Sequence, residues 1–168
     1  MIKTVLTLSA FSFAFAAASA AAQTFIKTTG DWSAFKDDSS KSRSCYIASA
    51  PKKETGNYKR RGDTFVLISH RPGESAWDVF ELRAGYAYKK GSRVTLVIDG
   101  QKFGLFTQQN AAWAKDAKTD RALARAMIRG SKMIVTGTSA RGTTTVDTYS
   151  LRGFTAAYKT IGRECGMK

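Results

Sequence analysis

The chain has 168 residues, of which 27 are lysine or arginine and 13 are aspartate or glutamate, so it carries a net charge of +14. This length is that of one ordinary domain, and the single histidine and two cysteines are too few for a zinc site once the cysteines pair. The excess of basic residues favours acidic partners such as anionic glycans, lipid headgroups or phosphates.

Residues 1–22 are predicted to be a secretory signal peptide. A positive residue comes first, Val5–Ala18 is apolar, and small residues create cleavage sites at Ala20 and Ala22. The apolar run is too short for a comfortable membrane span, and no later segment is apolar enough for one. We therefore expect residues 23–168 to form the mature protein, periplasmic or secreted, where nucleic acid is not an expected partner.

The cysteines predict a disulfide bond. An exported chain with an even number of cysteines favours pairing, and here only one intramolecular pair exists, Cys45 with Cys165. It would tie an early strand to the C-terminus, and a loop of that length is worth about 4–5 kcal/mol on the loop-entropy relation. The same bond would remove the only thiols, so no cysteine nucleophile is expected.

The first part of the mature chain is predicted to contain four strands. Gln23–Gly30 is expected to be a leader that precedes them. Pro51–Arg61 has three lysines and two arginines and is expected to be an exposed basic loop. The continuous apolar run Phe65–Ile68 indicates a strand buried on both faces. The four strands are Asp31–Lys36, Arg43–Ala50, Asp63–His70 and Trp77–Ala84.

A hairpin is predicted next, after an aromatic and basic loop at Gly85–Gly91. Alternate residues of Val94–Ile98 are apolar and would share one face of a strand. Asp99–Gly100 is a strong signal for a two-residue type I′ turn. The return strand is expected over Lys102–Thr107.

One long helix and a second hairpin complete the chain. Ala117–Arg129 is predicted to be helical, with Asp116 or Thr119 as its N-cap and Gly130 as a left-handed residue that ends it. The elements expected after it are a strand over Met133–Thr138, turn residues Ser139–Gly142, a strand over Thr143–Leu151 and a short helix over Phe154–Arg163.

These elements predict a mainly β fold: an antiparallel β-sandwich or barrel-like single domain with one longer helix and a short C-terminal helix. The chain shows no internal repeat and no low-complexity linker. It also lacks the alternation of strands and helices that builds a parallel sheet.

A row of arginines on the predicted helix is a candidate surface for an anionic ligand. Arg121, Arg125 and Arg129 are spaced four residues apart, so they share one side and repel one another. Lys89 and Lys90, from the aromatic and basic loop, are expected to assist them. The alternative is an ordinary solvated helix face.

The second hairpin carries an unusual carboxylate. Asp147 shares one face of its strand with Thr143, Thr145 and Tyr149, and aspartate is disfavoured in strands unless it has a partner. Arg141 at the hairpin tip, or another arginine, could be that partner. We favour a buried network that holds the hairpin; the alternative is a polar binding face.

No catalytic residue, metal site or cofactor is predicted. His70, the only histidine, ends a buried strand, where a structural role is common. Four carboxylates could in principle form a pair for glycan hydrolysis. A turn position explains one of them and the first turn of the helix another. The four are Glu81, Asp99, Asp120 and Asp147.

Several segments resemble the invasion-associated locus B family of exported bacterial proteins. The clearest block runs from Gly137 to Thr143 and continues through Asp147–Leu151 to Phe154. Many members have a further cysteine soon after the first tryptophan, and its absence here resembles the shorter, two-cysteine branch. The other matching pieces are Gly30–Trp32, Cys45–Ile47, Gly85–Gly91, Ala112–Ala114, Ala126–Met127 and Gly130.

The resemblance implies an exported β-sandwich protein linked to host-cell invasion or envelope function, without established catalytic chemistry. Together with the charge, it predicts a non-enzymatic binding protein of the bacterial envelope. Its expected partner is an anionic glycan, a lipid headgroup, or a host or envelope protein. The alternative is a cell-wall-acting enzyme, or an inhibitor of a host or envelope enzyme.

Overall fold

The computed structural model describes residues 23–38 and 43–167. The predicted signal peptide, residues 1–22, lies outside the described residues. No helix within the described ranges has the length and apolar character that a membrane span requires.

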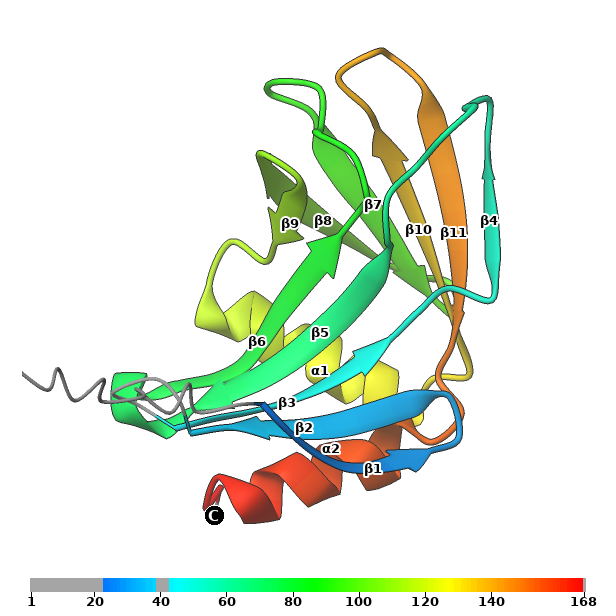
Figure 1. Ribbon diagram of the computed structural model, residues 1–168. Coiled ribbons are helices and arrows are strands. Elements are labelled where there is room, and N and C mark those ends of the chain that lie inside the picture. The colour runs from blue at the N-terminus through cyan, green and yellow to red at the C-terminus, as the bar shows by residue number, and fades with distance from the viewer. Residues whose placement is uncertain (1–22, 39–42, 168) are drawn as a thin grey trace, which may run out of the picture.

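Eleven strands in the described residues form one continuous antiparallel sheet, which curls but does not close into a barrel. The sheet order is β1-β2-β3-β5-β6-β9-β8-β7-β10-β11-β4, and β1 and β4 are its two edges (Figure 1). The strands are β1 (Thr24–Thr29), β2 (Trp32–Asp37), β3 (Ser44–Ser49), β4 (Lys53–Gly56), β5 (Phe65–Arg71), β6 (Ala76–Arg83), β7 (Arg93–Ile98), β8 (Gln101–Gln108), β9 (Ala111–Trp113), β10 (Lys132–Thr138) and β11 (Thr144–Ser150).

The predicted fold class is confirmed: the chain is mainly β, antiparallel and a single domain. Two helices are present in the part described, α1 (Ala117–Arg129) and α2 (Phe154–Glu164), and a short 3-10 turn covers Pro72–Glu74. The sheet is continuous because β9, which the sequence pattern did not reveal, pairs with β6 on one side and β8 on the other. Ala112 lies opposite Leu82 in one ladder and opposite Thr107 in the next.

Two segments expected to be irregular are edge strands. The predicted leader Gln23–Gly30 contains β1, which pairs with β2, and the predicted basic loop Pro51–Arg61 contains β4, which pairs with β11. Both strands are largely exposed to solvent, so their residues show no alternation of apolar and polar side chains. Pairing with an existing strand supplies the order that the local pattern does not predict.

Gly130 was expected to end α1 in a left-handed conformation, and that prediction is wrong. Its φ is −88° and its ψ is 166°, so the backbone is extended there. A Cβ atom at this position would lie 2.6 Å from Cγ2 of Ile98 and 2.9 Å from Cδ1 of Leu151. Glycine is therefore required by close packing, not by the backbone angle.

Other local signals are confirmed. Asp116 is the N-cap of α1, since its carboxylate accepts a hydrogen bond from the Thr119 N–H at 2.7 Å. Asp99 and Gly100 form the turn between β7 and β8 with positive φ at both residues. The Asp99 carboxylate also accepts hydrogen bonds from the backbone of Ser131 and Lys132, so it joins this turn to the start of β10.

The helices cover one end of the curled sheet (Figure 1). α1 packs mainly on β6, and α2 packs on β2 and β3. Trp32 is fully buried, meets Phe154 edge to face at 4.9 Å, and donates its indole N–H to the Ser150 carbonyl. The predicted disulfide is also confirmed: Cys45 of β3 is bonded to Cys165, directly after α2.

Asp120 links α1 to the pH dependence of stability. It lies buried in the first turn of the helix and accepts a hydrogen bond from the Phe80 N–H at 2.9 Å. Burial raises the pKa of Asp120 from 3.8 to about 6, against that hydrogen bond, which lowers it. The folded protein therefore keeps a proton that the unfolded chain loses near pH 4. The contribution of Asp120 to the free energy of unfolding is therefore largest below about pH 4 and is lost as the pH rises from there through about 6.

The Asp120→Asn variant is expected to match wild type near pH 4 and to exceed its free energy of unfolding by about 1–3 kcal/mol at pH 7. Urea unfolding of both proteins between pH 4 and pH 8 measures this difference. Burial lowers the pKa of His70, so this residue makes the free energy of unfolding rise with pH. Its contribution is the same in both proteins and cancels in the difference between them. A difference between the two proteins that stays constant with pH would contradict the assignment.

Candidate ligand-binding site

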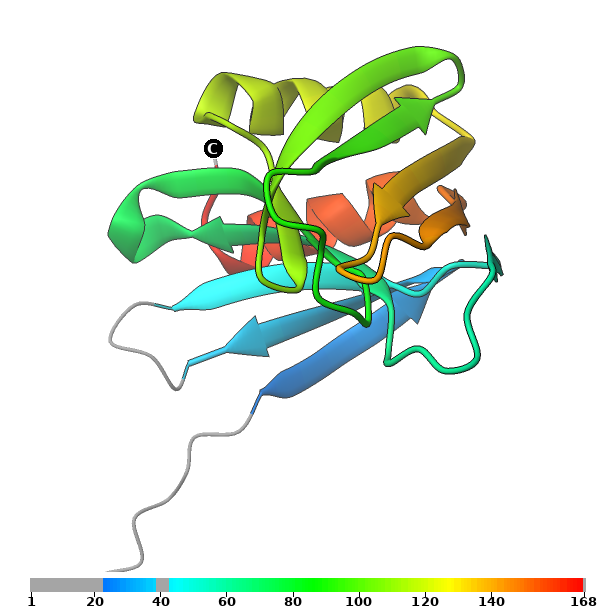
Figure 2. The same cartoon turned by 90° about the horizontal axis from the view of Figure 1, so that it is seen from above.

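Three loops gather at the end of the sheet away from the helices (Figure 1, Figure 2). They are the segment between β4 and β5, the segment between β6 and β7, and the tip of the β10–β11 hairpin. Backbone hydrogen bonds join them: Gly62 N–H donates to the Gly85 carbonyl at 2.9 Å, and Ala140 N–H donates to the Ala87 carbonyl at 2.7 Å. The three loops are therefore held together without any ligand.

Gly85 is required for the contact between the first two loops. Its φ is +69°, and a Cβ atom there would lie 2.1 Å from the carbonyl oxygen of Gly62. A side chain at Gly85 would therefore push the two loops apart.

A cleft of about 780 Å³ lies between these loops, and we call it the tip cleft. None of its lining residues is acidic. Lys59, Arg60 and Arg141 are exposed, and none of them has an ion-pair partner in the part of the chain that the structure describes. The full lining is Asn57, Tyr58, Lys59, Arg60, Arg61, Tyr86, Ala87, Ser139, Ala140, Arg141, Thr143 and Thr145.

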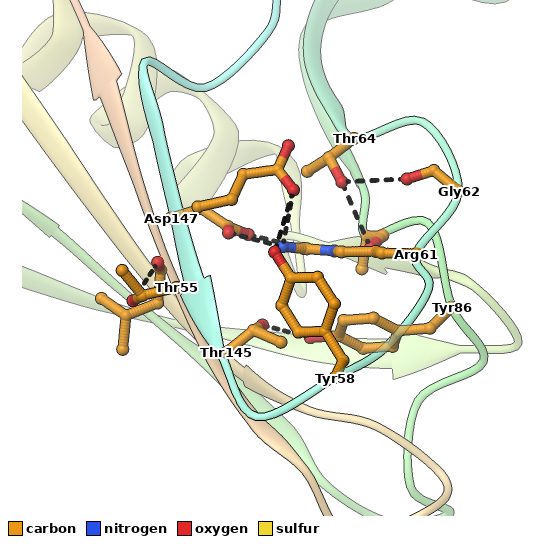
Figure 3. Close-up of polar contacts among 11 residues, drawn as sticks. Thr55, Tyr58, Arg61, Gly62, Thr64, Tyr86, Thr145 and Asp147 are labelled. Carbon is orange, nitrogen blue, oxygen red and sulfur yellow. Dashed lines mark hydrogen bonds and ion pairs between the residues drawn. The ribbon is translucent and has the colours of Figure 1, made fainter.

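Arg61 holds the segment between β4 and β5 in place through contacts beneath the cleft. Its guanidinium donates two parallel hydrogen bonds to Asp147, at 2.6 and 2.7 Å, and a third from Nε to the Ala84 carbonyl at 2.7 Å. The side chains of Arg61 and Asp147 are each only 3% exposed. Figure 3 shows Arg61 beside the rings of Tyr58 and Tyr86, whose centroids lie 5.7 and 5.0 Å from its central carbon.

The pair is an internal structural contact and not a free binding group. Burial acts to lower the pKa of Arg61, but the hydrogen bonds and charge of Asp147 raise it above its ordinary value, so the guanidinium stays charged. Its charge is neutralised by Asp147 and by Glu54, whose carboxylate lies 3.4 Å from Nη1, so the guanidinium is engaged within the protein. The favoured interpretation of Asp147, a buried network with an arginine, therefore holds, with Arg61 as the partner instead of Arg141.

The floor of the cleft is formed by a tyrosine and a threonine. The Tyr86 hydroxyl lies 2.6 Å from Oγ1 of Thr145, and the Tyr86 ring meets the Tyr88 ring edge to face at 5.3 Å. A Cβ atom at Gly137 would lie 2.9 Å from both tyrosines, so glycine makes room for them over β10. Burial raises the pKa of Tyr86, so its hydroxyl stays protonated beside Thr145.

The structure separates the residues of the predicted polar hairpin face. Arg141, Thr143 and Thr145 line the tip cleft. Asp147 lies beneath it, and Tyr149 is fully buried in the core, so neither presents a surface for a ligand. Tyr86, from the predicted aromatic and basic loop, is part of the cleft, while Lys89 and Lys90 are exposed nearby in sequence but do not line it.

The sequence reading missed Tyr58, Lys59 and Arg60 as site residues. They belong to the segment expected to be a plain basic loop. The signal was present, because Asn57–Arg61 places a tyrosine directly before three cations. Gly85–Gly91 has the same combination of aromatic and basic residues, and there it was noted.

The predicted arginine row lies elsewhere. Arg121, Arg125 and Arg129 are exposed on α1, toward the other end of the molecule from the tip cleft (Figure 1). No acidic side chain within the described ranges forms an ion pair with them. The structure does not bring Lys89 and Lys90 to this row, and the row's role as a binding surface stays a prediction.

The residues considered for catalysis have structural partners. His70 is fully buried, and its Nδ1 accepts a hydrogen bond from the Asp78 N–H at 3.2 Å. A second cavity of about 270 Å³ is lined by two carboxylates, Asp63 and Glu81, but Glu81 is bound to the Arg83 guanidinium. Among the described residues no group of three or more histidine, cysteine or acidic side chains is placed to hold a metal ion.

The family comparison covers the whole cleft. The model of the family described as Invasion associated locus B (IalB) protein matches residues 32–162. This range begins at β2 and reaches into α2, so it includes every residue that lines the tip cleft. Searches of curated proteins and of solved structures found no match.

Proposed function

We propose that this chain, which belongs to the invasion associated locus B family, is an exported, non-enzymatic protein that binds an anionic component of the envelope or of a host in its tip cleft. Family membership supports an invasion-associated bacterial protein. The disulfide fits a periplasmic or extracellular location. Export would use residues 1–22 as the signal peptide.

One observation carries the choice of site. Lys59, Arg60 and Arg141 surround a concave cleft that contains no acidic residue, and only the fourth cation, Arg61, is neutralised from within. Like charges held together repel, and an anionic ligand relieves that repulsion. Because the loops are already joined by backbone hydrogen bonds, binding would cost little ordering of the protein.

The arginine row on α1 ranks second. Arg121, Arg125 and Arg129 carry the same sign and are exposed, but they lie on a helix surface and line neither of the two cavities. A ligand there would remain hydrated and its contacts would be screened by salt. The row is therefore a suitable control for the cleft.

We expect Arg60→Glu/Arg141→Glu to weaken binding of anionic probes by at least about tenfold, because each arginine supplies a charge-assisted hydrogen bond. The control is Arg121→Glu/Arg125→Glu, which changes the net charge equally and should bind nearly as wild type. The probes are heparin oligosaccharides, phosphatidylglycerol vesicles and polyglutamate, one for each class of anionic partner. Affinities measured at several salt concentrations should fall as salt rises.

Each other outcome has a definite meaning. Equal losses in the two double variants would show that net charge alone drives the association. A loss confined to the α1 variant would move the site to the arginine row. Failure of the wild-type protein to bind any of the three probes would overturn the proposal.

The cell-wall enzyme or inhibitor remains the alternative, and the cavity with Asp63 and Glu81 is where an enzyme's carboxylates would have to act. There the Glu81 carboxylate is already bound to the Arg83 guanidinium, so it is not free to act on a substrate. The Glu81–Arg83 pair therefore places this alternative behind the binding function.

A further inference from the structure

We infer that the ligand of the tip cleft is an acidic carbohydrate, whose sugar ring lies against Tyr58 and Tyr86 and whose carboxylate or sulfate lies between Arg60 and Arg141. This inference rests on the proposed binding function and narrows it from anionic ligands in general to one class.

The cleft has the size and lining of a small-ligand site. Its volume of about 780 Å³ falls within the range of pockets that enclose one small molecule or a few sugar units. The rings of Tyr58 and Tyr86 are half-buried and each meets the Arg61 guanidinium, and their remaining surface in the cleft is apolar and suits the C–H face of a sugar. The exposed amide of Asn57 and the half-buried hydroxyl of Thr143 offer donors and acceptors for sugar hydroxyls, while Ser139 and Thr145 are buried in the lining.

The cations supply the preference for an acidic sugar. Arg60 and Arg141 come from different loops, and both line the cleft with no acidic neighbour in its lining. A guanidinium binds a planar carboxylate, or two oxygens of a sulfate, with two parallel hydrogen bonds. A neutral sugar would leave both cations unpaired, so it should bind more weakly.

A lipid surface fits the cleft less well. Proteins that bind membrane surfaces insert apolar side chains beside their basic residues. Within the described ranges the exposed large apolar side chains are Phe25 and Phe106, and neither lines the cleft. The cleft thus has the charges that a headgroup would need but lacks the apolar rim that holds a membrane.

A polypeptide is also disfavoured. Stable protein interfaces bury roughly 800 Å² on each partner over a broad patch. The unpaired cations of the tip cleft lie together in one concave site. The loops around it are fixed by the Gly62–Gly85 and Ala140–Ala87 hydrogen bonds and by Arg61. Such a site suits a narrow ligand with rings and hydroxyls.

The test uses the mature protein with its disulfide intact and measures dissociation constants by titration calorimetry. The probes are an oligogalacturonate, a heparin tetrasaccharide, a neutral dextran oligomer, inorganic sulfate and phosphatidylglycerol vesicles. The acidic oligosaccharides should bind at least about tenfold more tightly than dextran or sulfate, which each lack one half of the recognised chemistry.

Two variants localise the binding. Tyr58→Ala should weaken oligosaccharide binding by about tenfold, and Arg141→Glu should weaken it by at least as much while leaving dextran unaffected. Tyr46→Ala is the matched control, because Tyr46 is a half-buried tyrosine on β3 that stacks on Phe35 outside the cleft. Arg141 is exposed at a hairpin tip, so its variant keeps the test valid if Tyr58→Ala fails to fold.

The failures are distinguishable. Binding of the vesicles without binding of the acidic oligosaccharides would overturn the carbohydrate inference and leave the proposed anion-binding function standing. Binding of none of the acidic probes would overturn both. Oligosaccharide binding that is unchanged in Tyr58→Ala and Arg141→Glu would place the carbohydrate outside the tip cleft and overturn this inference.

Discussion

Replacing Asp147 by alanine is expected to lower the free energy of unfolding by about 3 kcal/mol, because the buried Arg61 guanidinium loses two short hydrogen bonds and keeps only the more distant, partly exposed carboxylate of Glu54 as a counter-charge. The two side chains are each 3% exposed and share two short hydrogen bonds. Arg61→Ala should have a similar effect through the orphaned carboxylate. Urea unfolding at neutral pH measures both.

Two controls test whether the loss of stability comes from leaving a buried charge without its partner. The exposed ion pair between Arg43 and Asp38 is about half accessible on both sides, and Arg43→Ala should cost less than about 1 kcal/mol. The double variant Arg61→Met/Asp147→Leu removes both charges and should regain much of the stability lost in the single variants. Single-variant losses below about 1 kcal/mol would mean that water reaches the pair in solution.

Breaking the disulfide is expected to cost a comparable amount, about 4–5 kcal/mol, since it joins residues separated by 120 positions. The double variant Cys45→Ala/Cys165→Ala removes it without leaving buried thiols. A typical domain has only about 5–15 kcal/mol of stability, so the variant should be marginally folded. Chemical denaturation of oxidised wild type against the variant gives the difference.

The position of the disulfide also predicts which part of the protein is destabilised most when the bond is absent. Cys165 directly follows α2, and Cys45 lies in β3 under that helix. Amide hydrogen exchange in the variant should therefore accelerate most in α2, while the β10–β11 hairpin keeps its protection. The reduced wild-type protein serves as a control and should behave like the variant. A variant as stable as oxidised wild type would contradict this role of the bond.

Sequence patterns predicted the longer strands that have two neighbours and a buried face, but not β9, which has only three residues. The alternation in Thr144–Ser150 correctly placed Thr145, Asp147 and Tyr149 on one face, because side-chain direction in a strand depends only on parity. The same pattern could not say that this face points inward. Facing direction is set by the packing of elements distant in sequence.

The missing parts of the prediction share a cause. β1, β4 and β9 carry little or no pattern of their own, and they are ordered by pairing with neighbouring strands. Arg61 follows β4 in a segment that reads as a solvated basic loop, and only the pairing of β4 with β11 brings it over Asp147. The contact between Arg61 and Asp147 was therefore beyond prediction, because local composition does not encode a partner far along the chain.

The pairing of β4 with β11 fixes when the cleft is completed during folding. Lys53 pairs with Thr148, so a chain made from its N-terminus must wait for nearly its whole length before β4 finds its partner. Such distant contacts form slowly, because the chain between the two strands must lose conformational entropy before any stabilising contact is made. The Arg61–Asp147 pair and the Cys45–Cys165 bond both depend on these last-made segments. A chain truncated before β11 would therefore have a free thiol at Cys45 and would lack the Asp147 carboxylate that neutralises Arg61, so it would differ from the finished protein at both ends of the molecule.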